Sequence, residues 1–154
     1  MPRNKVLITQ LVDLSRGVCY HSPGDFMKYV IKHIDDYEQI ECIHNGKCIG
    51  YINYKFANRS VWLNKIKVDK EYRGHGVGKT LLKLFENESL SMWKSVVEGK
   101  FYPEDEDGLV VKRFYESNGY KIEKEGYETE LYKVLKEKHN LTGVDISYEK
   151  SNKR

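Results

Sequence analysis

The chain has 154 residues, of which 40% are hydrophobic and 12% are aromatic. A chain of this length fits one globular domain with one core, so a second domain is not expected. Its 26 basic residues against 23 acidic ones leave a net charge of +3, which is too small to indicate nucleic acid as the main partner.

Targeting and metal-binding signals are missing from the sequence. No stretch approaches the roughly 18 consecutive apolar residues of a membrane span, and the first residues lack the cleavage pattern of a signal peptide. The three cysteines, Cys19, Cys42 and Cys48, show no CxxC spacing, and the five histidines form no HxxxH pattern. We therefore expect a cytoplasmic protein without a disulfide framework, a membrane partner or a metal.

The N-terminal part predicts a strand followed by a helix. The aliphatic run at residues 5–14 is typical of a strand. Asp25 is a suitable helix N-cap, and apolar residues recur at helical spacing over residues 26–34. On this interpretation His33 lies on the face of a helix and is not a ligand.

The next segment predicts antiparallel strands. Residues 37–54 alternate between apolar and polar side chains on both sides of Asn45-Gly46, which is the strongest short-range hairpin signal available. Residues 57–60 then turn the chain into a further strand. We expect a meander of three antiparallel strands.

Residues 61–79, VWLNKIKVDKEYRGHGVGK, combine an alternating strand, a charged turn and a glycine-rich loop. Directly after the loop, Val77, Leu81 and Leu84 recur at helical spacing, so a helix is predicted to about residue 89. A glycine loop between a strand and a helix is the central feature of the chain.

The remaining elements alternate between strands and a helix. The acidic run at 104–107 is expected as a solvated loop whose last residue caps that helix. The elements predicted after residue 94 are a short strand at 95–97 ending near Gly99, a helix at 109–118, and strands at 120–124 and 127–135. The tail at 136–154 is polar and is expected to be partly mobile, with a short strand suggested at 144–146. The domain is therefore expected to span residues 1–135.

The glycines of the central loop predict an anion site. Gly74, Gly76 and Gly78 occupy every second position before the helix, so backbone N–H groups can converge on one point. The helix dipole adds partial positive charge there. Arg73 and Lys79 flank the loop and can neutralise a diphosphate.

Two familiar phosphate motifs do not fit this loop. The nucleoside-triphosphate P-loop, GxxxxGK[ST], would need a glycine where the chain has Arg73. It also needs a buried parallel strand leading straight into the loop, whereas residues 69–72 intervene here. In the dinucleotide motif GxGxxG the third glycine comes later than Gly78 does.

The pattern [RQ]xxGxG does fit, with Arg73, Gly76 and Gly78. Further along, residues 114–120, FYESNGY, look like a second segment, FYExxGF. With both segments in this order, the chain resembles the GCN5-related N-acetyltransferase (GNAT) superfamily over about residues 5–135. The resemblance implies a three-layer α/β domain with a mixed, mostly antiparallel, centrally splayed sheet flanked by helices.

The resemblance also implies a function: transfer of an acetyl group from acetyl-CoA to a primary amine of a small molecule or protein. Tyr115 matches the tyrosine that protonates the departing thiolate, and a phenol with an ordinary pKa near 10 is a suitable donor for that step. The cofactor-binding positions implied are Ile66, Lys67, Val68, Arg73, Gly74, His75, Gly76, Val77, Gly78, Lys79 and Thr80.

Two positions depart from the family pattern. Asn64 stands where many relatives carry a glutamate that serves as general base, and an amide cannot accept the ammonium proton. Glu98, Glu104 or Asp105 could take that role, as could water for an amine of low pKa. Gly108 stands where relatives often place an asparagine that contacts the cofactor.

Several alternatives stay open at this point. Asn64 allows a non-catalytic acyl-CoA-binding sensor or partner-binding module of the same fold, and a nucleotide hydrolase is a third hypothesis. The acidic run at 104–107 would suit a cationic amine such as a polyamine, an aminoglycoside or a protein amine. A monomer or a homodimer is expected.

Overall fold

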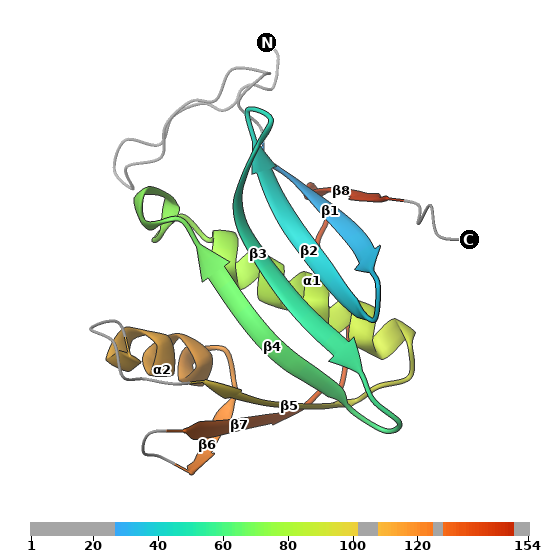
Figure 1. Ribbon diagram of the computed structural model, residues 1–154, viewed down its shortest axis with the longest axis vertical. Coiled ribbons are helices and arrows are strands. Elements are labelled where there is room, and N and C mark those ends of the chain that lie inside the picture. The colour runs from blue at the N-terminus through green and yellow to red at the C-terminus, as the bar shows by residue number, and fades with distance from the viewer. Residues whose placement is uncertain (1–26, 102–107, 125–127, 150–154) are drawn as a thin grey trace.

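A computed structural model describes residues 27–101, 108–124 and 128–149. Its strands form one sheet in the order β6-β7-β5-β4-β3-β2-β1-β8, with two α-helices packed against it (Figure 1). Neighbouring strands are antiparallel except for the parallel pairs β4–β5 and β1–β8. The predicted fold class, a mixed and mostly antiparallel sheet flanked by helices, is confirmed.

The elements follow the chain in a simple order. The strands are β1 (Met27–Ile34), β2 (Tyr37–His44), β3 (Lys47–Phe56), β4 (Val61–Val68), β5 (Val96–Phe101), β6 (Lys121–Lys124), β7 (Thr129–Val134) and β8 (Asp145–Tyr148). In the described residues the helices are α1 (Val77–Ser91) and α2 (Gly108–Ser117), and η3 (Lys70–Tyr72) is a 3₁₀ turn. The strand predicted at residues 5–14 and the acidic run at 104–107 lie outside the described residues.

The helix predicted for residues 26–34 is wrong, because this segment is strand β1. Tyr29 and Ile31 are buried at alternate positions, which is the period of a strand. The turn between β1 and β2 contains Asp35 with a φ of 49°, which allows the two strands to pair. Across this hairpin His33 Nδ1 lies 2.6 Å from Glu38 Oε2, so His33 is part of a strand pair.

The hairpin predicted around Asn45-Gly46 is confirmed as β2–β3. Both turn residues have positive φ, 53° for Asn45 and 76° for Gly46, as a two-residue hairpin turn of type I′ requires. Because β1 precedes the hairpin and β4 follows it, the antiparallel meander has four strands where three were predicted.

The main core lies between the sheet and α1, which contacts β2, β3 and β4 behind the sheet in Figure 1. Ile40, Ile52 and Leu63 face this layer from successive strands, and Leu81 and Phe85 meet them from the helix. All five are at most 1% exposed, and burying each such side chain stabilises the fold by about 1.5–3 kcal/mol. The helix predicted to about residue 89 is confirmed and ends at Ser91.

The sheet opens between β4 and β5. These strands pair only where Val61–Leu63 meets residues 97–99, and Figure 1 shows their later parts diverging on either side of α2. Next to the last pair, the β3–β4 register shifts: Tyr54 pairs with Leu63 and Asn53 pairs with Lys65. Asn64 is therefore the extra residue of a β-bulge, and a bulge bends the strand that carries it.

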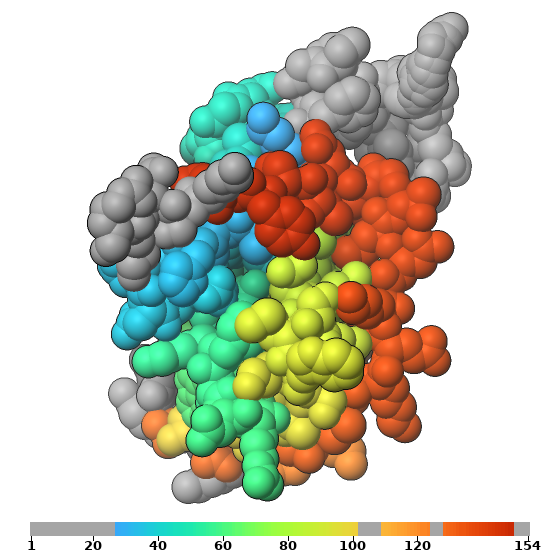
Figure 2. Space-filling model, turned by 90° about the vertical axis from the view of Figure 1, so that its right-hand side faces the viewer, coloured from blue at the N-terminus to red at the C-terminus, as the bar shows by residue number. Residues whose placement is uncertain are grey.

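The C-terminal part returns across α1 to the far edge of the sheet. The predicted strands near residues 120–124 and 127–135 are confirmed as β6 and β7, and the strand suggested at 144–146 is found as β8 beside β1. Figure 2 shows this orange to red segment lying against the yellow-green α1. Asn87 and the backbone of His139 exchange two hydrogen bonds there, and Tyr148 donates to Glu88 at 2.6 Å.

None of the helices in the described part of the chain is both long and apolar enough to cross a membrane.

Replacing Gly99 by alanine should lower the free energy of unfolding by about 1–3 kcal/mol, the usual cost of overpacking. A Cβ atom at Gly99 would stand 2.6 Å from the backbone oxygen of Leu63, on the last pair that holds β4 and β5 together. Urea unfolding measures the loss, with Glu98→Ala on the exposed side of the same strand as control. An unchanged midpoint for Gly99→Ala would contradict this packing.

Candidate functional site

The glycine loop joins the open end of β4 to the start of α1. Gly74 and Gly76 have φ values of 84° and 85°, a region that glycine adopts without strain. Gly76 is the N-cap of α1 and, having no side chain, supplies no cap to the N–H groups of the first turn. The loop therefore presents backbone donors to solvent at the positive end of the helix dipole.

Basic side chains surround these donors. Arg73 is exposed, and its Nε donates to the backbone oxygen of Val68 at 2.9 Å, which ties the loop to the end of β4. Lys79 is exposed in the first turn of α1, and Lys67 is exposed on β4. Uncapped N–H groups and cations together fit a diphosphate such as that of coenzyme A.

The free edge of β4 continues this surface. The N–H of Asp69 donates to Ile49 O at 2.8 Å, and bonding alternates along an antiparallel pair. Lys67 therefore bonds toward β3, whereas Ile66 and Val68 direct their N–H and C=O groups toward β5. Since β4–β5 pairing stops at Leu63, these groups have no strand partner in the described sheet.

Helix α2 lies across the opening. A Cβ atom on Gly78 would meet the ring of Phe114 at 3.3 Å, so α2 contacts the start of α1. On the β5 side, the rings of Tyr115 and Phe101 lie 5.4 Å apart. Consecutive residues of α2 thus reach both sides of the splayed strands, and Gly78 leaves the room that this contact needs.

Tyr115 is 3% exposed and is surrounded by other aromatic rings. Phe114 and Tyr120 each lie 5.6 Å from it, in addition to Phe101. Burial raises the pKa of the Tyr115 hydroxyl well above its usual value. This buried phenol is therefore a weaker acid than the phenol of ordinary pKa expected from the sequence, although it is protonated at neutral pH.

The predicted cofactor-binding residues lie on β4, in the glycine loop and in the first turn of α1. Val77 is 2% exposed, so only its backbone can face a ligand. Their places are β4 for Ile66, Lys67 and Val68, the loop for Arg73, Gly74, His75 and Gly76, and the first turn of α1 for Val77, Gly78, Lys79 and Thr80.

A chain of side-chain amides crosses the sheet from Asn64, and sequence reasoning missed it. Asn64 Nδ2 donates to Asn53 Oδ1 at 2.9 Å, Asn53 Nδ2 to Gln39 Oε1 at 3.4 Å, and Gln39 Nε2 to Glu41 Oε2 at 2.7 Å. Glu41 Oε1 lies 3.0 Å from Lys32 Nζ. These residues lie far apart in sequence, and a bulge sets the register between their strands, so no local signal reveals them.

Of the three carboxylates proposed as general bases, the structure describes only Glu98. Glu98 Oε1 accepts a hydrogen bond from Ser60 Oγ at 3.3 Å, beside the closed end of the splay. Glu104 and Asp105 lie outside the described residues. Gly108 is the first residue of α2.

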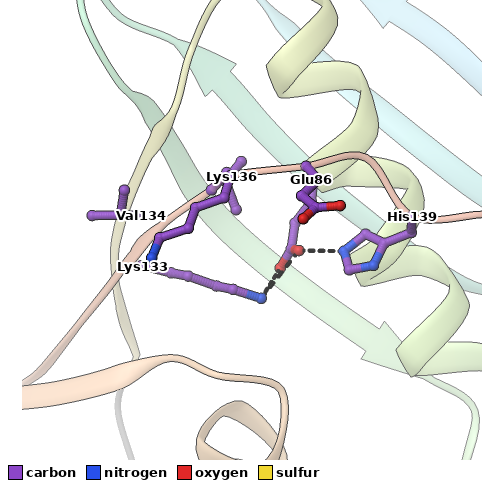
Figure 3. A pocket seen from close by; sticks show the side chains of 7 residues that line it. Glu86, Lys133, Val134, Lys136 and His139 are labelled. Atoms are coloured by element: carbon purple, nitrogen blue, oxygen red, sulfur yellow. Dashed lines mark hydrogen bonds and ion pairs between the residues drawn. The ribbon is translucent and has the colours of Figure 1, made fainter.

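A separate cavity lies beside Glu86 in the middle of α1 (Figure 3). Glu86 is 3% exposed and accepts hydrogen bonds from Tyr120 at 2.7 Å, Lys133 at 3.1 Å and His139 at 2.7 Å. Its charge is thus balanced by groups from β7 and the C-terminal segment. This cluster joins α1 to the sheet and to the tail, so we assign it a structural role.

Within the described ranges, His, Cys, Asp and Glu side chains form no group of three or more that could hold a metal ion.

A known protein family matches the part of the chain that contains the glycine loop. The model of the acetyltransferase (GNAT) domain family matches residues 36–122, which is more than half of the chain. The chain belongs to the GNAT acetyltransferase family. The match includes β4, the glycine loop, α1 and α2, and it confirms the family that the two sequence motifs indicated. No curated protein sequence matches the chain significantly.

Solved structures share the fold. The PaiA N-acetyltransferase from Thermoplasma acidophilum, in complex with coenzyme A, is 23% identical with a TM-score of 0.59, over 65% of this chain and 62% of that one. A GNAT acetyltransferase from Staphylococcus aureus Mu50 is 22% identical with a TM-score of 0.58, over 66% and 69%.

A third related structure is a streptothricin acetyltransferase candidate from Bacillus anthracis Ames in complex with acetyl coenzyme A. It is 20% identical with a TM-score of 0.57, over 68% of this chain and 65% of that one. The chain thus spans less than two thirds of the length of the Thermoplasma and Bacillus proteins. At these identities the likeness establishes a common fold.

Replacing Glu86 by glutamine should lower the free energy of unfolding by about 3 kcal/mol, because Lys133 and His139 lose their buried carboxylate. Urea unfolding measures the loss. Glu88→Gln is the control, since Glu88 bonds an exposed tyrosine hydroxyl and its neutralisation should cost less than about 1 kcal/mol. An equal loss of unfolding free energy in the two variants would contradict the structural role assigned to Glu86.

Proposed function

We propose that this protein transfers an acetyl group from acetyl-CoA to a primary amine. The observation that carries the proposal is the glycine loop at the open end of β4, beside a strand edge without a partner on its β5 side. Such a site offers an anion cradle and a row of backbone groups leading away from it. Family membership supports the same assignment.

Each part of the donor then has a binding surface. The N–H groups at the start of α1, with Arg73 and Lys79, hold the pyrophosphate. The backbone groups of Ile66 and the N–H of Val68 bond the pantetheine arm, since the oxygen of Val68 already accepts from Arg73 Nε. Binding there points the thioester toward Asn64, where β4 and β5 begin to diverge.

The chemistry needs orientation and two proton transfers. Holding the amine against the thioester makes the attack effectively unimolecular. The N–H of Val68 is a candidate to polarise the thioester carbonyl. The nitrogen passes a proton to water as the C–N bond forms, and Tyr115 protonates the sulfur as the C–S bond breaks.

Acetyl-CoA should raise the melting temperature of the protein, and Lys79→Ala should weaken its binding about tenfold, as expected for one lost charge-assisted hydrogen bond. Isothermal titration calorimetry measures both affinities. The control is Lys83→Ala, one turn further along α1, which should bind like the unmodified protein. Stabilisation by magnesium-ATP and not by acetyl-CoA would contradict the proposal and favour a nucleotide hydrolase.

Tyr115→Phe should lower kcat about a hundredfold, the lower range of general acid catalysis, while acetyl-CoA affinity stays unchanged. The measurement is thiol release with the best acceptor from an amine panel. Tyr132→Phe on β7 is the control. An unchanged kcat for Tyr115→Phe would leave the ring with a packing role alone.

The second candidate is a non-catalytic acyl-CoA-binding module, and the amide at Asn64 favours it because a carboxylate base is missing there. Acetyl-CoA binding without thiol release across the panel would support this alternative. A cationic acceptor would suit residues 104–107, which lie outside the described residues. Cytoplasmic location and a monomeric or homodimeric state stay predictions.

A further inference from the structure

The β-bulge puts the side chains of Asn64 and Lys65 on the same face of the sheet. Leu63 is 1% exposed, Asn64 and Lys65 are both exposed, and Ile66 is half-buried. Two successive side chains therefore point to the face of the sheet opposite α1, which a regular strand would not allow. Asn64 thus stands on the open face, next to the last β4–β5 pair.

The hydrogen-bond polarity of the amide chain follows from its far end. An ionised carboxylate only accepts hydrogen bonds, so Glu41 requires the NH₂ group of Gln39. The carbonyl of Gln39 then faces Asn53 and accepts from its NH₂ group, and Asn53 in turn accepts from Asn64. Lys32 Nζ lies 3.0 Å from the other oxygen of Glu41 and pairs with it.

This polarity leaves Asn64 Oδ1 at the outer end of the chain. Among the described residues, no donor bonds to this oxygen. The three amide dipoles point the same way, and aligned hydrogen bonds polarise one another. Asn64 Oδ1 is therefore a strengthened acceptor at the place where the thioester is expected.

We propose that Asn64 Oδ1 accepts an N–H of the acceptor amine, and that Glu41 is a positioning residue that acts through Gln39 and Asn53. The proposal rests on the proposed acetyl transfer and adds the class of acceptor to it. That class is an amine of low basicity, which enters the site uncharged.

The low basicity follows from the charges on this face. An amide carbonyl orients an N–H group but cannot remove a proton from an ammonium ion. Lys65 lies beside Asn64 on the same face, and like charges disfavour a cation there. A neutral amine avoids both problems: its lone pair forms the C–N bond, its proton passes to water, and the C–S electrons leave on sulfur, which is protonated.

The test uses 4-methoxyaniline as the weakly basic probe and benzylamine as the strongly basic one, with thiol release as readout. Asn64→Ala and Glu41→Gln should each lower kcat/KM for 4-methoxyaniline about tenfold, the effect of one lost hydrogen bond. The double variant should lose no more than either single one, because the two residues act as one unit. Losses that multiply would overturn the positioning role.

Glu38→Gln is the matched control, because Glu38 lies on the same strand and its carboxylate bonds His33 outside the amide chain. It should leave kcat/KM unchanged. Below the pKa of each amine, kcat/KM should rise with pH to that amine's own pKa, and 4-methoxyaniline should be the better acceptor at neutral pH. Preference for benzylamine, or transfer to neither amine, would overturn the acceptor class.

NMR of the ¹⁵N-labelled protein provides a readout that needs no turnover. The side-chain amide signal of Asn64 should shift and exchange faster in Glu41→Gln but not in Glu38→Gln, because glutamine at position 41 no longer sets the polarity. An unmoved Asn64 signal would overturn the role of Glu41. If the unmodified protein did not bind acetyl-CoA, the proposed function itself would be refuted. This outcome is distinguishable from a failure of the role proposed for Glu41.

Discussion

The bulge at Asn64 is the constraint on which the rest of the site depends. One extra residue in β4 bends the strand just after its last pair with β5, so the two strands separate while β4 stays bonded to β3. The same shift exposes two consecutive side chains, and the backbone of Ile66 and Val68 has no strand partner on the β5 side. In a regular strand Lys65 would point to the face opposite that of Asn64.

The two ends of this opening have different chemistry. At the far end, the glycine loop and α1 offer N–H groups and cations, which suit phosphate. At the near end lies the amide of Asn64, and the phenol of Tyr115 is buried on α2 with its ring 5.4 Å from that of Phe101 at the end of β5. The Glu86 cluster joins α1 to the sheet, and it reaches Tyr115 through Tyr120, which donates to Glu86 and whose ring lies 5.6 Å from that of Tyr115.

The change from carboxylate to amide at position 64 alters what the site can recognise. A carboxylate attracts a cation and can take its proton, whereas an amide can only orient a donor. The chain through Asn53 and Gln39 to Glu41 suggests that a negative charge still acts here, at a distance and through aligned dipoles. This arrangement favours orientation of an uncharged amine over proton removal. The positive charge of Lys65 beside Asn64 also disfavours a cationic acceptor.

Local patterns in the sequence determined much of this protein. The Asn45-Gly46 hairpin, the glycine loop, α1, α2 and the later strands follow from turn chemistry and periodicity within a few residues. The strand at Met27–Ile34 was mistaken for a helix because its apolar residues also fit helical spacing, and pairing with β2 decided the outcome. The candidate site also has a part that the sequence predicts and a part that only the tertiary structure shows. The loop residues and Tyr115 could be named from motifs, whereas the bulge, the burial of Tyr115 and the amide chain exist only in the tertiary structure. They depend on hydrogen bonds and contacts between strands and helices distant in sequence, and no local pattern specifies that register.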